Sequence, residues 1–156
     1  MGRRTAYIEL NTSNQIYSLS VGRIKKNFTY HGITFYPCVT VTSLPEILNK
    51  DFDFFILDMG VLNIYTAKVF ANCDKQFLVC SLVKWKEQQT LERITKLFEQ
   101  TYLHQEQIVF LNNLQTKGST LFSTFKHRIS IPFIPNPFQI ETQLFHVFHQ
   151  ILERKN

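Results

Sequence analysis

The chain has 156 residues, of which 44% are hydrophobic and 14% aromatic, with only five glycines and five prolines. This composition excludes a disordered or low-complexity protein and predicts a single packed domain over residues 1–156 with a core rich in phenylalanine. A net charge of +5 favours acidic partners, and nucleic acid and anionic lipid are both candidates.

Short apolar segments of strand length alternate with amphipathic helical patterns along the chain. A capping box, with Ser43 as N-cap and Glu46 at N3, is expected to open the first helix. Because the strands are apolar on both faces, we predict an α/β fold of three layers, a mainly parallel sheet flanked by helices. In chain order, the predicted elements are strands at residues 6–10 and 33–36, a helix at 44–48, a strand at 54–57, a helix at 64–71, a strand at 76–82, a helix at 87–102, strands at 107–111 and 130–134, and a helix at 140–153.

Cysteine usage indicates a cytoplasmic protein. Cys38, Cys73 and Cys80 are odd in number and follow neither a C-x-x-C pattern nor a zinc-ligand spacing. We therefore expect reduced thiols, with neither a disulfide framework nor a zinc site. The sequence shows no apolar signal region and no apolar run as long as a membrane span, so we expect no transmembrane segment.

Polar residues follow the predicted strands at the edge where ligands bind in parallel α/β sheets. Asp58 is the most informative, because it ends the apolar strand at 54–57 and Gly60 follows two residues later. A buried strand that delivers one carboxylate to its carboxyl end can place that group near a phosphate-bound magnesium ion. The other residues in such positions are Glu9, Asn11, Ser81, Asn112, Asn113 and the segment 135–137.

Taken in order, these segments resemble the MinD/ParA family of deviant Walker ATPases. Residues 7–11, Tyr-Ile-Glu-Leu-Asn, resemble the second strand of that family, and residues 54–60 resemble its Walker B strand and the start of its second switch. Residues 71–79 are similar to the approach to its next strand. The segment 108–112 resembles the strand whose terminal Asn contacts adenine, and 131–135 resembles the I-P-x-x-P segment beside the base.

The resemblance implies a P-loop NTPase fold and a nucleotide site with ATP and magnesium as cofactors in a full-length form. Asp58 would be the catalytic carboxylate and would bind magnesium through water. Gly60 would let the switch approach the γ-phosphate, and Asn112 with Pro135 would flank adenine. Glu9 and Asn11 would lie near the nucleotide, where the family has an acidic pair.

The sequence lacks the phosphate-binding loop that is typical of that family. The sequence contains no G-x-x-x-x-G-K-[ST] motif and no Gly-Lys pair. In the family, the first strand and the phosphate loop precede the segment matched by residues 4–10. Without the N–H groups and the lysine of that loop, three phosphates and a metal would face mainly carboxylates. We therefore expect no ATP hydrolysis by this chain alone.

The missing loop has two alternative explanations. The chain is either part of a longer ATPase or a protein that reuses the sheet without catalysis. The first is favoured, because the family's first strand lies inside the sheet and its loss leaves unpaired backbone groups and apolar surface. Self-association through that gap is expected. The predicted function is a degenerate or truncated MinD/ParA-like nucleotide-binding domain that acts in protein positioning or assembly.

The competing functions are a nucleotide-independent protein-interaction module and non-specific DNA binding. Basic and aromatic residues alternate at 23–30 and 84–86, where they could anchor a protein partner or stack a base. Solvated loops are the simpler interpretation of both segments. The strand-end residues also have plain structural interpretations. Asp58 with Gly60 can simply end a strand and begin a turn, Asn112 can belong to an ordinary turn, and Glu9 and Asn11 are expected to be solvated.

Overall fold

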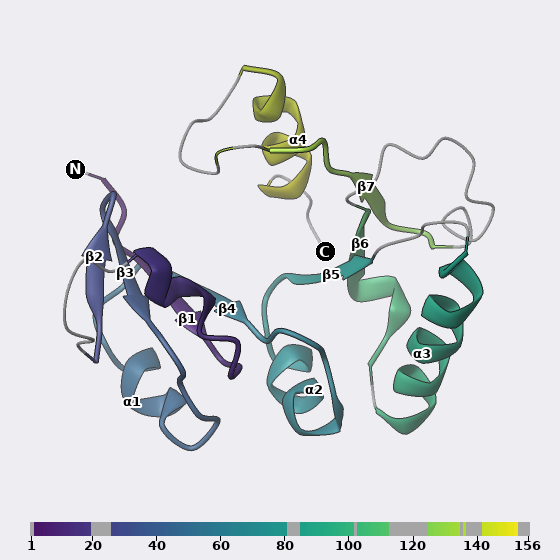
Figure 1. Cartoon of the computed structure of the whole chain (residues 1–156), viewed down its shortest axis with the longest axis horizontal. Coiled ribbons are helices and arrows are strands. Elements are labelled where there is room, and N and C mark those ends of the chain that lie inside the picture. Colours follow the sequence, from purple (N-terminus) through teal and green to yellow (C-terminus); the bar gives the residue numbers. More distant parts are fainter. Residues whose placement is uncertain are drawn as a thin grey trace. The chain divides into compact units, whose positions relative to one another are not determined.

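The chain forms a mixed α/β protein with two mainly parallel sheets and flanking helices (Figure 1). The computed structural model describes residues 2–19, 26–80, 85–101, 103–112, 125–134, 136 and 142–152. The chain divides into two compact units, Met1–Val69 and Phe70–Asn156.

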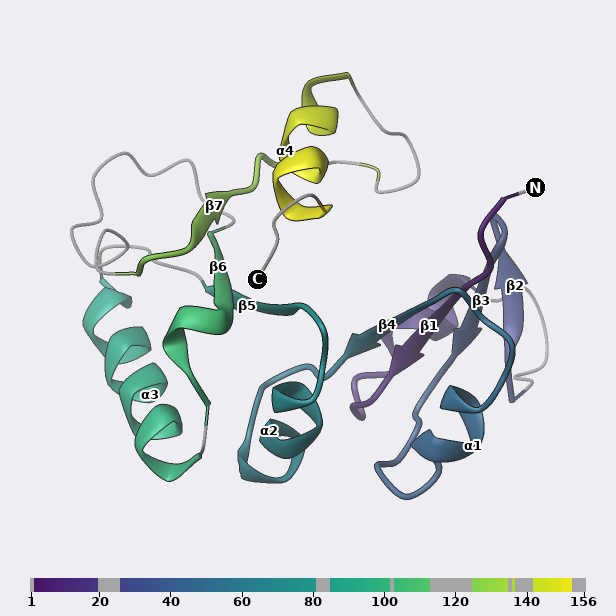
Figure 2. The same ribbon diagram turned by 180° about the vertical axis from the view of Figure 1, so that it is seen from behind.

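Unit 1 is built on a four-stranded sheet, sheet A, with the strand order β2-β3-β1-β4. Strand β1 lies in the interior of the sheet and pairs in parallel with both β3 and β4. The segments η1 and α1 lie on opposite faces of this sheet (Figures 1 and 2). The elements are β1 (Thr5–Glu9), the 3-10 helix η1 (Gln15–Leu19), β2 (Phe28–Tyr30), β3 (Ile33–Tyr36), α1 (Leu44–Leu48), β4 (Phe54–Asp58) and α2 (Ile64–Ala71), which spans the division between the units.

Strand β2 was not predicted from the sequence, which indicated a solvated loop at 23–30. Phe28–Tyr30 pair antiparallel with β3. The two-residue connection, His31 and Gly32, has φ values of 47° and 78°, and positive φ at both positions suits a tight hairpin turn. Phe28 stacks on Phe35, with ring centroids 5.3 Å apart, which supports the pairing. A strand this short gives too few positions for an alternating pattern to be recognised.

The two helices of unit 1 begin differently from one another. Ser43 is the N-cap of α1, as predicted, but the capping box is wrong, because its side chain makes no cap hydrogen bond. The Ser43 hydroxyl instead accepts a hydrogen bond from the backbone N–H of Thr40, at 3.2 Å. Helix α2 has the predicted bounds. Asn63 fixes its start, since its Oδ1 accepts from the backbone N–H groups of Tyr65 and Thr66 at 2.9 and 3.2 Å.

Unit 2 is built on a second, three-stranded sheet, sheet B, in which all strands are parallel in the order β5-β6-β7. Helix α3 connects β5 to β6, and α4 follows β7 (Figure 2). Lys75, just before β5, donates to the backbone carbonyl of Ile151 in α4 at 3.3 Å. The elements are β5 (Gln76–Cys80), α3 (Glu87–Gln100), the 3-10 helix η2 (Gln105–Gln107), β6 (Ile108–Asn112), β7 (Arg128–Ser130) and α4 (Thr142–Leu152).

The last predicted strand, at residues 130–134, is wrong. Strand β7 ends at Ser130, which is also the last residue paired with β6. Residues 131–134 are not in a strand, and Pro132 has no backbone N–H with which to continue a ladder. The predicted ends of the neighbouring elements at 81–82, 102, 140–141 and 153 lie outside the described residues.

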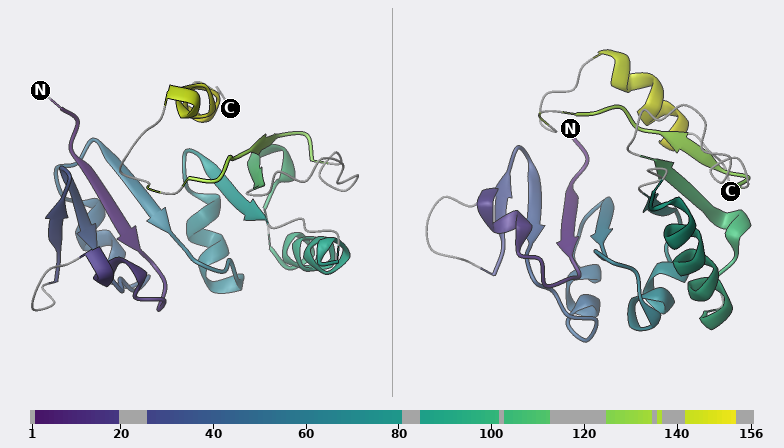
Figure 3. Two further views of the ribbon diagram at one scale, coloured as in Figure 1. Left: turned by 45° about the horizontal axis from the view of Figure 1, so that its top comes forward. Right: turned by 45° about the vertical axis from the view of Figure 1, so that its right-hand side comes forward.

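Each sheet has an interior strand with fully buried side chains, β1 in sheet A and β6 in sheet B. Ala6 and Ile8 of β1 are fully buried, as are Ile108 and Phe110 of β6. The sequence predicted one mainly parallel sheet, whereas the structure has two, with β4 at an edge of sheet A and β5 at an edge of sheet B. Figure 3 shows β1 lying between β3 and β4 in sheet A. The predicted phenylalanine core is confirmed for part of the set, with Phe35, Phe70, Phe110 and Phe125 buried but Phe54, Phe133 and Phe145 exposed.

Candidate functional site at the carboxyl edge of sheet A

Four of the six predicted site residues gather at the carboxyl edge of sheet A. Glu9 ends β1 and Asp58 ends β4, and the parallel register sets their Cα atoms opposite one another. Asn11 and Gly60 follow these strand ends, and the side-chain amide of Asn11 donates to the backbone carbonyl of Asp58 at 3.2 Å. These four residues form the carboxyl-edge cluster.

The Asp58 carboxylate is held in a fixed orientation by two donors. The Tyr7 hydroxyl donates to Oδ2 at 2.7 Å, and the backbone N–H of Gly60 donates to Oδ1 at 2.9 Å. Burial, and then the hydrogen bond with Asp58, raise the pKa of Tyr7 above its usual range, so its hydroxyl stays protonated at neutral pH. An ionised carboxylate has about four acceptor positions. Positions on Asp58 therefore remain for a water molecule or another donor.

Gly60 is required by the local backbone. Its φ is +59°, and a Cβ added there would lie 3.0 Å from the Cβ of Asn11. The bond from Gly60 N–H to the Asp58 side chain closes a turn of the kind that Asp commonly forms with the residue two positions on. This turn accounts for the glycine without a ligand, and it leaves the Asp58 carboxylate at the sheet edge.

Glu9 is fully buried, so the expectation that it is solvated is wrong. Its Oε1 accepts from the hydroxyl of Ser13 at 3.0 Å and from the backbone N–H of Gln15 at 2.9 Å. The thiol of Cys38 lies 4.0 Å from Oε2. The segment after β1 folds back over the strand end and supplies these donors. Glu9 therefore anchors the connection from β1 to η1. Asn11 is half-buried rather than fully solvated.

The other two predicted site residues belong to unit 2. Asn112 ends β6, where its Cα is paired with those of Cys80 and Ser130. Pro135 lies outside the described residues, as do Ser81 and Asn113. Trp85, from the second basic and aromatic segment, is 81% exposed.

Tyr7 and Ser13 contact the two carboxylates of the cluster, and neither was among the predicted site residues. A signal for Tyr7 exists in the strand period, because residues 7 and 9 of β1 share one face and the register brings that face beside Asp58. Ser13 had no comparable signal. Its contact with Glu9 depends on the path of the chain after the strand.

The thiols and acids of the described residues form no recognisable metal centre. Among those residues, no group of three or more His, Cys, Asp or Glu side chains could hold a metal ion. The three cysteines are present as thiols, and burial raises the pKa of Cys80 to about 11 and that of Cys73 above its usual value. In the part of the chain that the structure describes, no helix is both long and apolar enough to cross a membrane.

Comparisons with protein-family models, with curated proteins and with solved structures found no match for this chain. The likeness to the MinD/ParA family therefore stays a prediction that rests on its sequence segments. The fold and the site define a mixed α/β protein that has a carboxylate-bearing cluster at the carboxyl edge of sheet A.

Proposed function

We propose that this chain is a degenerate MinD/ParA-like nucleotide-binding domain that does not hydrolyse ATP by itself and acts in protein positioning or assembly. The observation that carries the proposal is the gathering of Glu9, Asn11, Asp58 and Gly60 at one sheet edge. Ligands of open α/β sheets bind beyond the carboxyl ends of the strands, which is where this cluster lies. In this proposal Asp58 is the counterpart of the Walker B carboxylate, which its place at the end of β4 supports.

The contacts of the two carboxylates support a non-catalytic role. Asp58 is held by Tyr7 and Gly60, and among the described residues neither Asp58 nor Glu9 forms an ion pair with a lysine or arginine. Phosphoryl transfer depends on positive charge and N–H donors around the phosphates. The sequence has no G-K-[ST] segment to supply them. A nucleotide bound at the cluster would take most of its phosphate contacts from another segment or chain.

Nucleotide binding is tested by thermal unfolding. We expect millimolar magnesium-ATP to raise the melting temperature of the wild type by about 2–4 °C. Weak binding to the folded state produces a shift of this size in a protein of this length. Asp58→Ala should abolish the shift, because it removes the carboxylate that would hold the hydrated magnesium ion. The matched control is Asp53→Ala, directly before the same strand, where the carboxylate accepts from the backbone N–H of Arg4 at 2.6 Å. This variant should keep the shift. A wild type without any shift would refute nucleotide binding by this chain.

The second candidate function, a nucleotide-independent interaction module, is favoured by the open edge at β4. Within the described residues β4 pairs with β1 alone. Phe54 and Ile56 of this strand are 45% and 48% exposed. The register places Ile56 beside Tyr7 on one face of sheet A. An edge strand with unpaired backbone groups and apolar side chains readily accepts a further strand.

Association through this edge is tested by sedimentation over a range of protein concentrations. We expect the wild type to self-associate and Ile56→Lys to weaken that association about tenfold, since a lysine blunts an edge strand. Val41→Lys is the control, because Val41 is 44% exposed but lies outside the strands. A wild type that stays monomeric at every concentration would contradict self-association through β4.

A further inference from the structure

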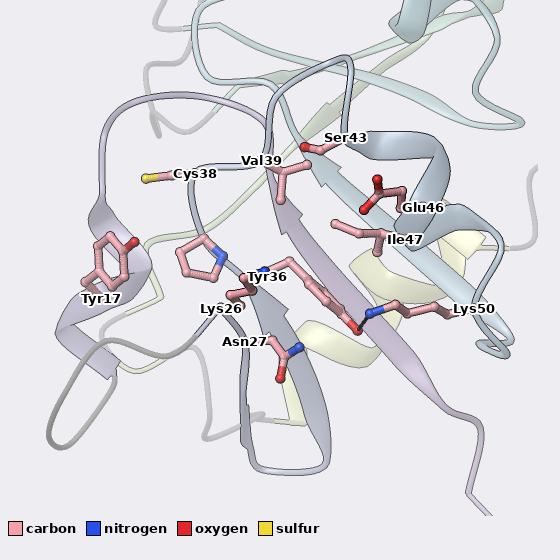
Figure 4. Close-up of a pocket in the computed structure, with 11 residues that line it drawn as sticks. Tyr17, Lys26, Asn27, Tyr36, Cys38, Val39, Ser43, Glu46, Ile47 and Lys50 are labelled. Atoms are coloured by element: carbon pink, nitrogen blue, oxygen red, sulfur yellow. Dashed lines mark hydrogen bonds between the residues drawn. The ribbon is translucent and has the colours of Figure 1, made fainter.

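Unit 1 contains an open pocket of about 500 Å³ beside the end of β3 (Figure 4). Residues from four separate segments line it: η1, residues 26–27, the end of β3 with the residues that follow it, and α1 with Lys50. We name it the β3–α1 pocket. Its volume falls in the range of about 300–1,000 Å³ that is usual for small-molecule sites. It shares no residue with the carboxyl-edge cluster.

Hydrogen-bond donors gather on one side of the β3–α1 pocket. The Lys50 ammonium donates to the Tyr36 hydroxyl at 3.4 Å and lies 4.9 Å from the centre of its ring. Figure 4 shows Lys50 turned toward that hydroxyl, with Asn27 also on the pocket wall. The 3.4 Å bond is long, and among the described residues Lys50 forms no ion pair. Its ammonium can therefore turn to an incoming anion, together with the hydroxyl and the amide N–H.

Apolar surface forms another part of the pocket wall. Pro37 and Ile47 are buried, Val39 is half-buried, and all three line the pocket. The Tyr17 ring adds an aromatic surface. Flat rings pack favourably on surfaces of this kind.

The charge of the lining favours an anion. Lys26 and Lys50 both line the pocket, whereas Glu46 is the single acidic residue among those that do. The excess of positive charge is modest, so the ring contacts are needed to give the site its selectivity.

We propose that the β3–α1 pocket binds a small organic anion that carries a flat ring. The anionic group is held by Lys50, Tyr36 and Asn27, and the ring packs on the apolar wall at Pro37 and Val39. Phosphate and carboxylate groups share this chemistry, because both offer several oxygens to the same donors. The site is independent of the proposed function, since it uses no residue of the carboxyl-edge cluster.

Isothermal titration of the full chain with phenyl phosphate tests the proposal. Inorganic phosphate and phenol serve as probes that each carry half of the recognised chemistry. We expect phenyl phosphate to bind at least about tenfold more tightly than either, and Lys50→Gln to weaken it about tenfold or more, as loss of a charge-assisted hydrogen bond does. Chemical-shift changes at the backbone amides of Asn27 and Val39 should accompany binding and locate the probe.

The control is Lys68→Gln, which removes an exposed lysine on α2 that does not line the pocket. This variant should bind phenyl phosphate like the wild type. Tyr36→Phe keeps the buried ring and removes only the hydroxyl, so it should fold and bind several-fold more weakly. The proposal is overturned by an absence of binding, by equal affinity for phenyl phosphate and inorganic phosphate, or by equal losses in Lys50→Gln and Lys68→Gln. The last two results would indicate diffuse attraction to a basic surface.

Discussion

Replacement of Glu9 by alanine is expected to lower the free energy of unfolding by about 3 kcal/mol, because it leaves a cavity at a fully buried position and removes the acceptor of two hydrogen bonds. The side chain is fully buried, and its Oε1 accepts from the Ser13 hydroxyl and from the backbone N–H of Gln15. Both donors belong to the segment that leads into η1. Loss of the Glu9 side chain should therefore leave a cavity at the end of β1 and loosen that segment. Urea unfolding measures the loss of unfolding free energy, and hydrogen exchange at the Gln15 amide measures the loosening of the segment.

Glu9→Gln is the matched variant, because it keeps an oxygen in the position of Oε1 and changes the charge. We expect it to cost about 1 kcal/mol, since the acceptor for Ser13 and Gln15 is retained. Equal losses for the alanine and glutamine variants would show that the negative charge, and not the acceptor, is what unit 1 needs. Fast exchange of the Gln15 amide in the wild type would contradict the hydrogen bond itself.

The sequence predicts the strongly apolar elements well, because their burial leaves a clear pattern. Strands β1, β3, β4 and β6 lie within one residue of the predicted bounds at each end, and α2 has the predicted bounds. Their mainly parallel pairing was also predicted, from strands that are apolar on both faces. The short hairpin strand β2 was missed because three residues give too few positions for an alternating pattern, and the end of β7 at Ser130 was missed although Pro132 follows it two residues later.

The candidate site could be predicted in position but not in its contacts. That Glu9 and Asp58 end neighbouring strands follows from the apolar runs before them and from the parallel pairing. The burial of Glu9 could not be predicted in this way, because it depends on the chain reversing at Asn14, whose φ is 56°. Asn tolerates this left-handed conformation better than most residues, yet its presence alone does not indicate which strand end the loop will cover.

In unit 2, Phe110→Ala is expected to cost about 3–5 kcal/mol, the usual loss for a fully buried phenylalanine. Phe110 lies in β6, between β5 and β7, and is 0% exposed. Its ring stacks on that of Phe125, with centroids 3.7 Å apart. The substitution therefore removes packing at the centre of sheet B and leaves Phe125 without its stacking partner. Hydrogen exchange at the amides of β5 and β6 measures the loss within unit 2 directly.

Phe133→Ala provides the control for this prediction, because Phe133 is 79% exposed and should cost no more than about 0.5 kcal/mol. Phe110→Leu should fall between the two, since leucine fills part of the space but cannot stack on Phe125. The prediction is tested by the order of the three losses of unfolding free energy. A small loss for Phe110→Ala, similar to that of Phe133→Ala, would mean that β6 is not the packed centre of unit 2. The parallel pairing of β5, β6 and β7 would then have lost its main support, because Ile108 and Phe110 are the fully buried side chains of that sheet among the described residues.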